Sequence, residues 1–202
     1  MLRKVFLQKQ SISFIVSRWD KARDEIDKLF SEINKKGEGF KFSNNFTTRT
    51  CLYLLDMSVA LKVETFKKDS VLKIKENWDA IRKAIKDTVD LLNEFGFNSE
   101  NMISYVAVSP IVYYRYKGGN FDSSSKAELR KYIVIAQVRQ IFGTASNSAL
   151  TSIREALKAA PANSFSMANL NAVRFTGDRS LFEEFMEKRQ ELMSKALKDI
   201  LR

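Results

Sequence analysis

The chain of 202 residues contains no histidine, a single cysteine, two prolines and seven glycines. The lack of histidine excludes most hydrolytic triads, most zinc sites and every HNH-type nuclease centre. One cysteine cannot form an intrachain disulfide or a zinc cluster. So few prolines and glycines favour long uninterrupted helices over an all-β fold, which needs many more turn residues. We therefore expect a helical protein with no autonomous active site, no metal and no cofactor.

The single cysteine, Cys51, lies in the apolar run from Cys51 to Leu55. A free cysteine in such surroundings usually acts as a small hydrophobic residue. A nucleophilic thiol would need a neighbouring base, and no histidine is present to supply one. We predict a buried, unreactive Cys51 and a reducing compartment.

Several other signals are missing as well. The glycines form neither a phosphate-binding P-loop nor a dinucleotide fingerprint. The apolar run Val5–Leu7 breaks too early for a signal peptide, and no stretch approaches the roughly 18 apolar residues of a membrane span. These absences predict a cytoplasmic protein that does not enter a membrane.

The charge is unevenly balanced, with 34 Lys and Arg against 24 Asp and Glu and a formal net charge of +10. Such a balance favours polyanionic partners, which include nucleic acid, an acidic protein or a membrane surface. It is equally compatible with a basic protein that is merely soluble, and both interpretations stay open.

Apolar residues recur at steps of three and four, which predicts amphipathic helices. We expect an all-α multi-helix bundle of about seven to nine helices, with a long central helix. Residues 1–162 would form the bundle, and residues 163–202 an irregular loop plus a C-terminal helix packing on the same domain. The predicted helices cover residues 12–33, 46–59, 69–95, 99–109, 110–116, 125–142, 148–160 and 180–200, with a turn at 143–147.

Local signals set the expected helix ends. Gly37, Gly39 and Gly96 should stop helices. Pro110 suits the first position of a helix. Ser125 with Glu128 forms the pattern of a capping box, as does Ser180 with Glu183. Residues 103–108 alternate like a strand, but we favour a short helix capped by Ser99, and residues 161–177 are expected to be the least regular.

Basic residues provide the candidate nucleic-acid contacts. One set lies on the helix that begins near Ser125, and a second set lies among three tyrosines that could stack on bases. For the tyrosines Tyr113, Tyr114 and Tyr116 we favour a core role. The basic side of the 69–95 helix is interpreted as a solvated face rather than a phosphate-binding one. The candidate contact residues are Lys126, Arg130, Lys131 and Arg139, with Arg115 and Lys117.

Five segments, in this order, look familiar together. They are Phe46–Thr50, the Trp78 helix ending in Phe95–Gly96–Phe97, Ser104 to Tyr114, Arg139–Gly143 followed by Ser146, Ser148 and Leu150, and Leu181–Phe185 with Arg189. Their order resembles the helical portion of the GmrSD-type restriction endonuclease family, whose members are bacterial and phage-defence proteins.

In that family a ParB/sulfiredoxin-like domain with an Asp-Gly-Gln-Gln-Arg motif handles nucleotide or DNA-backbone chemistry, and an HNH-type domain cuts DNA in many members. This sequence has neither the glutamine-rich motif nor any histidine. The resemblance therefore implies only the helical middle and the terminal helix, and no catalytic residue is carried over.

Three functional hypotheses follow. The first is a non-enzymatic interaction or scaffold module of a restriction or phage-defence system, whose partners would be DNA or a protein carrying the nuclease or NTPase parts. The second is a stand-alone basic nucleic-acid-binding protein without nuclease activity. The third is an enzyme that uses Asp and Glu with magnesium, which requires several acids to converge in a pocket. Arg49, near the start of a buried helix, is also expected to need a carboxylate partner.

Overall fold

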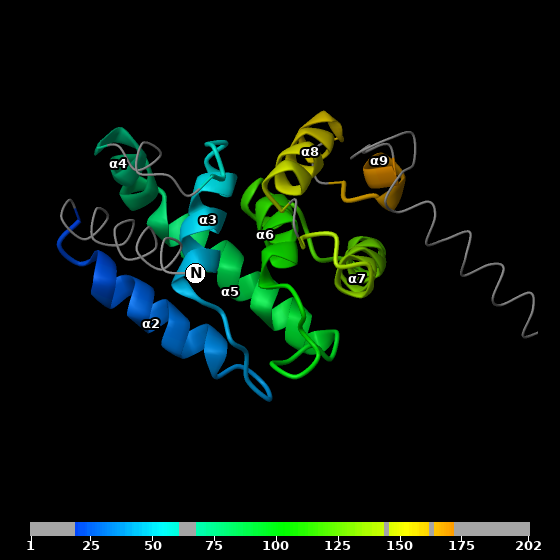
Figure 1. Cartoon of the computed structure of the whole chain (residues 1–202), viewed down its shortest axis with the longest axis horizontal. Helices are drawn as coiled ribbons and strands as arrows, with labels where there is room; N and C mark the ends of the chain where they lie inside the picture. The colour runs from blue at the N-terminus through cyan, green and yellow to red at the C-terminus, as the bar shows by residue number, and fades with distance from the viewer. Residues whose placement is uncertain (1–18, 61–67, 144–145, 162–163, 172–202) are drawn as a thin grey trace, which may run out of the picture.

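The computed structural model describes residues 19–60, 68–143, 146–161 and 164–171. In these ranges eight α-helices and one 3-10 helix form, and no strand is present (Figure 1), which confirms the all-α prediction. None of the described helices is both long and apolar enough to cross a membrane. The elements are α2 (Ala22–Asn34), α3 (Asn44–Leu54), α4 (Lys68–Glu76), α5 (Trp78–Glu94), η2 (Tyr105–Val108), α6 (Ser109–Tyr116), α7 (Ser123–Val138), α8 (Ser146–Ala159) and α9 (Met167–Asn171).

Helix α6 lies at the centre of the bundle, where it contacts α3, α5, α8 and η2. Figure 1 shows α2 packed along the outer side of α5, with α8, α7 and α9 beyond α6. Pro110 stands in the first turn of α6, as predicted, and Ile111 and Val112 are fully buried. The hydroxyls of Thr50 on α3 and Ser109 on α6 share a buried hydrogen bond of 2.9 Å. A short apolar helix thus joins the two halves of the core.

The helix predicted over residues 69–95 is two helices, and the single-helix prediction is wrong at Asn77. There the side-chain amide donates to the carbonyl of Lys73 at 2.9 Å, in competition with the backbone ladder. The Asn77 Oδ1 in turn accepts from the Tyr116 hydroxyl at 3.1 Å. The apolar stripe still passes across the break, because Ile74, Trp78 and Ile81 are all buried.

Ion pairs join α5 to α2 and to Lys36, which follows α2. Lys86 Nζ lies 2.8 Å from Glu32, and Lys36 Nζ lies 2.7 Å from Asp90. Arg82 adds a longer contact of 3.5 Å to Glu25. These partly exposed pairs fix which faces of the two helices meet, although each contributes little to stability.

Four helices end in the same way, with the residue after the C-cap in the left-handed conformation. Two of these ends use glycine, at Gly96 and Gly118, and two use other residues, at Asp56 and Gln140. The glycine stop at Gly96 was predicted, and Gly37 and Gly39 also have positive φ just after α2. Helix α3 ends at Leu54, so the predicted end near Val59 is wrong.

Two more local predictions need correction. Residues 103–108 form no strand; a short helix is present, but it begins at Tyr105 and is not capped by Ser99. Helix α7 is capped by Asp122, whose carboxylate accepts from the Ser125 N–H at 2.8 Å, so the capping box of Ser125 is also wrong. The competing partner is Met167, whose N–H donates to Glu128 at 2.9 Å.

The C-terminal part is only partly described. Helix α7 ends at Val138, before the predicted Phe142. Helix α8 begins at Ser146, inside the predicted turn of residues 143–147, and stops ahead of Pro161 as expected. Helix α9 forms inside the stretch predicted to be least regular and packs on α7 and α8. Residues 19–21 are not helical and α2 begins at Ala22, so the helix predicted over residues 12–33 is wrong there. The predictions for residues 12–18 and for the helix from Ser180 fall outside the described residues.

Cys51 is buried in the core, as predicted. Burial raises the pKa of its thiol to about 12, because the thiolate would lose its hydration. At neutral pH the thiol is therefore protonated and inert.

Candidate functional site

The basic residues predicted on α7 have partners within the fold. Lys126 lies 2.6 Å from Glu94, and Lys131 lies 2.6 Å from Glu128 on its own helix. The guanidinium of Arg130 stacks over the ring of Phe95 at 5.7 Å. Arg139 also interacts with another part of the chain. The α7 set is thus engaged in the fold itself.

The other two predicted basic residues, Arg115 and Lys117, also have partners within the fold. Arg115 pairs with Asp87 at 2.8 Å and donates to the carbonyl of Gly119 at 2.9 Å. Lys117 pairs with Asp56 at 3.1 Å. Four of the six predicted cations are therefore bound to four different carboxylates.

The tyrosines are core residues, as we favoured. Tyr113 and Tyr114 are buried, and Tyr116 is half-buried. The Tyr114 hydroxyl reaches the carbonyl of Asn120 and the hydroxyl of Ser125, both at 3.0 Å. Rings fixed in this way are not available as a stacking platform for bases on the outer surface.

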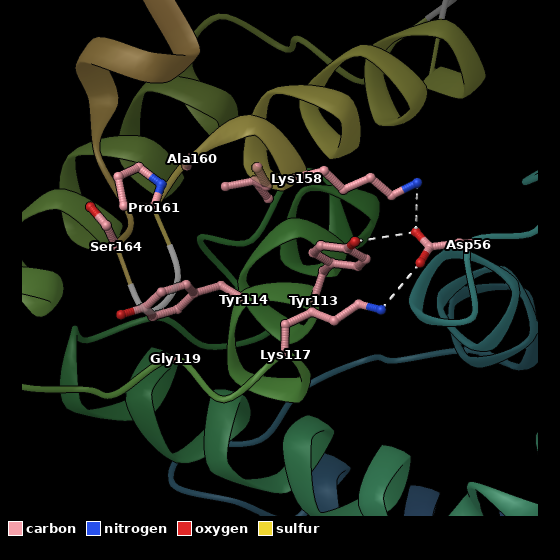
Figure 2. A pocket seen from close by; sticks show the side chains of 10 residues that line it. Asp56, Tyr113, Tyr114, Lys117, Gly119, Lys158, Ala160, Pro161 and Ser164 are labelled. Atoms are coloured by element: carbon pink, nitrogen blue, oxygen red, sulfur yellow. Dashed lines mark hydrogen bonds and ion pairs between the residues drawn. The ribbon is translucent and has the colours of Figure 1, made fainter.

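The described residues do enclose one cavity that combines charged and apolar side chains, with a volume of about 350 Å³. It lies between the end of α6, the last turn of α8 and the turn that follows α3 (Figure 2). Its lining residues are Asp56, Tyr113, Tyr114, Lys117, Gly119, Leu157, Lys158, Ala160, Pro161 and Ser164.

The carboxylate of Asp56 is the focus of this site. Figure 2 shows Lys117 and Lys158 reaching it from two sides, with one ammonium 3.1 Å from each carboxylate oxygen. The hydroxyl of Tyr113 donates to the same carboxylate at 3.2 Å. Arg154 adds a third cation, with its Nε 3.8 Å from Asp56. One carboxylate is thus surrounded by three cations and a phenol from α6 and α8.

The backbone of the preceding turn places Asp56 there. The N–H of Met57 donates to the carbonyl of Leu52 at 2.9 Å, and the N–H of Asp56 donates to that of Tyr53 at 3.2 Å. This pair of hydrogen bonds is the Schellman motif, which normally has glycine at the left-handed position. Asp56 occupies that position with φ of 59°. A non-glycine residue there costs free energy, and such outliers cluster at functional sites.

Arg154 holds the turn that carries Asp56. Its side chain is only 7% exposed, and its Nη1 donates to the carbonyls of Met57 at 2.8 Å and Tyr53 at 3.3 Å. The guanidinium also lies over the ring of Tyr53 at 5.2 Å. These contacts tie α8 to the turn that carries Asp56. A buried Arg held in this way is a fixed part of the site.

The pKa values of three groups at the cavity are shifted further from neutral pH. Burial alone would raise the pKa of Asp56, but the hydrogen bonds from Lys158 and Lys117 outweigh it and lower that pKa. Burial, followed by the nearby charge of Asp56, raises the pKa of Tyr113 well above its ordinary value. The hydrogen bond to Asp56 raises the pKa of Lys158. Each group therefore keeps one protonation state across the neutral range.

Other candidate chemistry finds little support in the described residues. No group of three or more Cys, Asp or Glu side chains there could hold a metal ion. The cavity contains one acid, Asp56, and its neighbours are cations. Among the described residues, Arg49 meets the hydroxyl of Ser146 at 3.1 Å and no carboxylate, and burial lowers its pKa.

Of the residues at this cavity, the sequence indicated Lys117 as a candidate nucleic-acid contact and Tyr113 and Tyr114 as core residues. Neither Asp56 nor Lys158 was predicted from the sequence. The only sequence signal for Asp56 is an acidic residue directly after an apolar helix, which is also common on ordinary surfaces. Its pairing with Lys158, about a hundred positions away, arises from tertiary packing of α8 against α6.

Comparison with known proteins adds no relative from which a role could be transferred. No family model matches the chain, and no curated protein matches it.

Proposed function

We propose that this protein is a non-enzymatic helical interaction module, which binds a partner group and does not transform it. The observation that carries the proposal is the ion-pair geometry at the cavity, where Asp56 lies 3.1 Å from the ammonium groups of both Lys117 and Lys158. A general acid or base works best when its pKa lies near the operating pH. Asp56 is shifted below its ordinary pKa and Tyr113 above it. Both are suited to act as fixed polar contacts.

The biological setting that we propose is a bacterial restriction or phage-defence system. The order of the sequence motifs, which resembles the helical portion of the GmrSD-type family, supports this setting. In this role the module would hold a protein that carries the nuclease or NTPase parts. The buried core tyrosines and the inter-helix ion pairs suit a rigid scaffold.

The coding region provides the test of this setting. A ParB-like segment encoded upstream, or defence genes alongside, would support it. The product of the adjacent gene should then co-elute with the chain in gel filtration at micromolar concentrations. A coding region with neither feature would contradict the assignment to a defence system.

A second candidate, direct nucleic-acid binding, is favoured by the net charge of +10. Fluorescence anisotropy with a labelled DNA duplex over a salt series would test it. Counterion release predicts a roughly thousandfold loss of affinity between 50 and 200 mM salt for about six phosphate contacts. Affinity that is absent at low salt would exclude this candidate.

Matched charge reversals would locate such contacts. R130E/K131E removes two exposed cations of α7, whereas K28E/K35E makes the same change of net charge on α2. If the predicted α7 residues contact phosphate, only the first variant should weaken binding strongly and equally for all DNA sequences. Equal losses in both variants would indicate an effect of net charge alone.

A further inference from the structure

We infer that the cavity between α6 and α8 binds a small organic monoanion, with a carboxylate carried on an aromatic or branched aliphatic body. This inference rests on the proposed function, because it takes the cavity to be a binding site. It assigns the charged end to Lys117 and Lys158 and the body to the apolar wall.

Lys117 and Lys158 have N–H donors that the described residues do not use. A lysine ammonium carries three N–H groups. Within the described residues, Lys117 uses one of them on Asp56, and Lys158 uses two, on Asp56 and Glu155. Their side chains are 45% and 37% exposed, so a ligand can reach both. A second carboxylate could therefore be held beside that of Asp56 by charge-assisted hydrogen bonds.

The charge of the cluster sets the charge of the ligand. Three cations, Lys117, Lys158 and Arg154, face two carboxylates, Asp56 and Glu155. One positive charge is left uncompensated, which a single negative charge neutralises. A divalent metal ion is disfavoured here, because the one inward carboxylate already lies among cations.

The remaining wall favours an apolar body. Tyr113, Tyr114, Leu157 and Pro161 line the cavity, and Figure 2 shows Tyr114 and Pro161 on the side away from the two ammonium groups. A volume of about 350 Å³ lies at the lower end of the range for small-molecule sites. The ring of Tyr114 is held by its hydroxyl contacts and by an edge contact of 5.5 Å to Phe165. Such a preformed wall reduces the cost of ordering on binding.

Asp56 acts as the internal competitor of the ligand. Its carboxylate occupies the same two ammonium groups that a ligand carboxylate would use. Replacement by asparagine removes this charge, keeps the shape of the side chain and tolerates the left-handed backbone. An anion site should therefore bind more tightly in D56N, whereas a cation site should bind more weakly.

Isothermal titration calorimetry of the full chain with 3-phenylpropionate tests the inference. The comparison ligands are 3-phenylpropionamide, which is neutral, phenethylamine, which is cationic, and acetate, which lacks the body. We expect 3-phenylpropionate to bind most tightly and acetate to bind at least about tenfold more weakly. Preference for the amine, or equal binding of acid and amide, would overturn the inference.

Three variants and one control variant locate the site. K117M and K158M should each weaken binding of 3-phenylpropionate by about tenfold, the usual effect of losing a charged hydrogen bond. K131M is the matched control, because Lys131 also pairs with a carboxylate but lies outside the cavity. D56N should strengthen binding several-fold. Unchanged affinity in both K117M and K158M, or weaker binding in D56N, would contradict the assignment.

The two proposals fail in different ways. If NMR spectra show 3-phenylpropionate being converted to a product at this site, the non-enzymatic function fails while the anion site stands. If no anion binds the wild-type chain, the inference fails, and the partner tests above still decide the function. Circular dichroism melts of each variant verify that a lost signal does not come from unfolding.

Discussion

The side-chain amide of Gln137 brackets the backbone of Ser104. Its Oε1 accepts from the Ser104 N–H at 2.7 Å, and its Nε2 donates to the Ser104 carbonyl at 3.0 Å. The same Oε1 also accepts from the N–H of Ile103 at 3.0 Å. A glutamine on α7 thus provides the hydrogen bonds that a neighbouring strand would provide. The backbone of Ser104 is therefore extended and satisfied in its hydrogen bonds, although no strand of the described residues pairs with it.

Removal of this amide should destabilise the protein strongly. Q137L would leave the N–H groups of Ile103 and Ser104 without their partner, and the Ser104 carbonyl would keep only the N–H of Ala107 at 3.3 Å. We expect a loss of roughly 2–4 kcal/mol in the free energy of unfolding. Urea denaturation would measure it. V138A, at an exposed position of the same helix, is the control and should change stability by about 0.5 kcal/mol or less. Similar losses in both variants would contradict this account.

Gln140 and Gly96 each follow a helix in the left-handed conformation, and substitutions at these two residues should have opposite effects on stability. Q140G should stabilise the protein by about 0.5–1 kcal/mol, because glycine adopts φ of 49° without a Cβ clash. G96A should destabilise it by about 1 kcal/mol. At Gly96 an added Cβ would meet no atom within 4 Å, so that loss isolates the backbone term. Thermal or urea unfolding of both variants measures the pair, and effects of equal sign would refute the prediction.

Gly119 is restricted by a neighbour, not by its backbone. An added Cβ would lie 2.4 Å from ring atoms of Tyr114, closer than real contacts allow. G119A should therefore displace this buried ring and cost roughly 1–3 kcal/mol, the usual range for overpacking. Near-UV circular dichroism should report the moved tyrosine, and denaturation the loss. An unaltered tyrosine signal would show that the ring does not need this glycine.

The ion cluster predicts how stability depends on pH. Because the folded state lowers the pKa of Asp56 below its ordinary value of 3.8, its contribution is present above that value and is lost as the pH falls further. The difference in unfolding free energy between the wild-type chain and D56N should therefore be seen at pH 7 and shrink towards pH 3. Denaturant titrations at both pH values would measure it. A difference that grows on acidification has the wrong sign and would contradict the prediction.

The fold could be predicted from the sequence wherever one signal acted locally. The stripe from Val71 to Leu92 and the stop at Gly96 depend on spacing and on one glycine, and both are found. The break at Asn77 could not be predicted, because it depends on a side-chain hydrogen bond and on the hydroxyl of Tyr116, 39 positions away.

The candidate site was harder to predict for the same reason. Its components come from the turn after α3, from α6 and from α8, and no sequence spacing links them. Asp56 takes the place in a helix-ending motif that glycine usually holds, so the sequence signal for that end was also missing. Basic residues were recognised as charges, but the carboxylates that bind them were not visible from composition.

The buried thiol of Cys51 makes the chain suited to spectroscopic labelling. With a pKa of about 12, it should scarcely react with maleimides at neutral pH while the protein is folded. A new cysteine at an exposed position such as Val138 could then carry a fluorophore or spin label without removal of the natural one. Distances between such labels would follow the chain as it meets its partners.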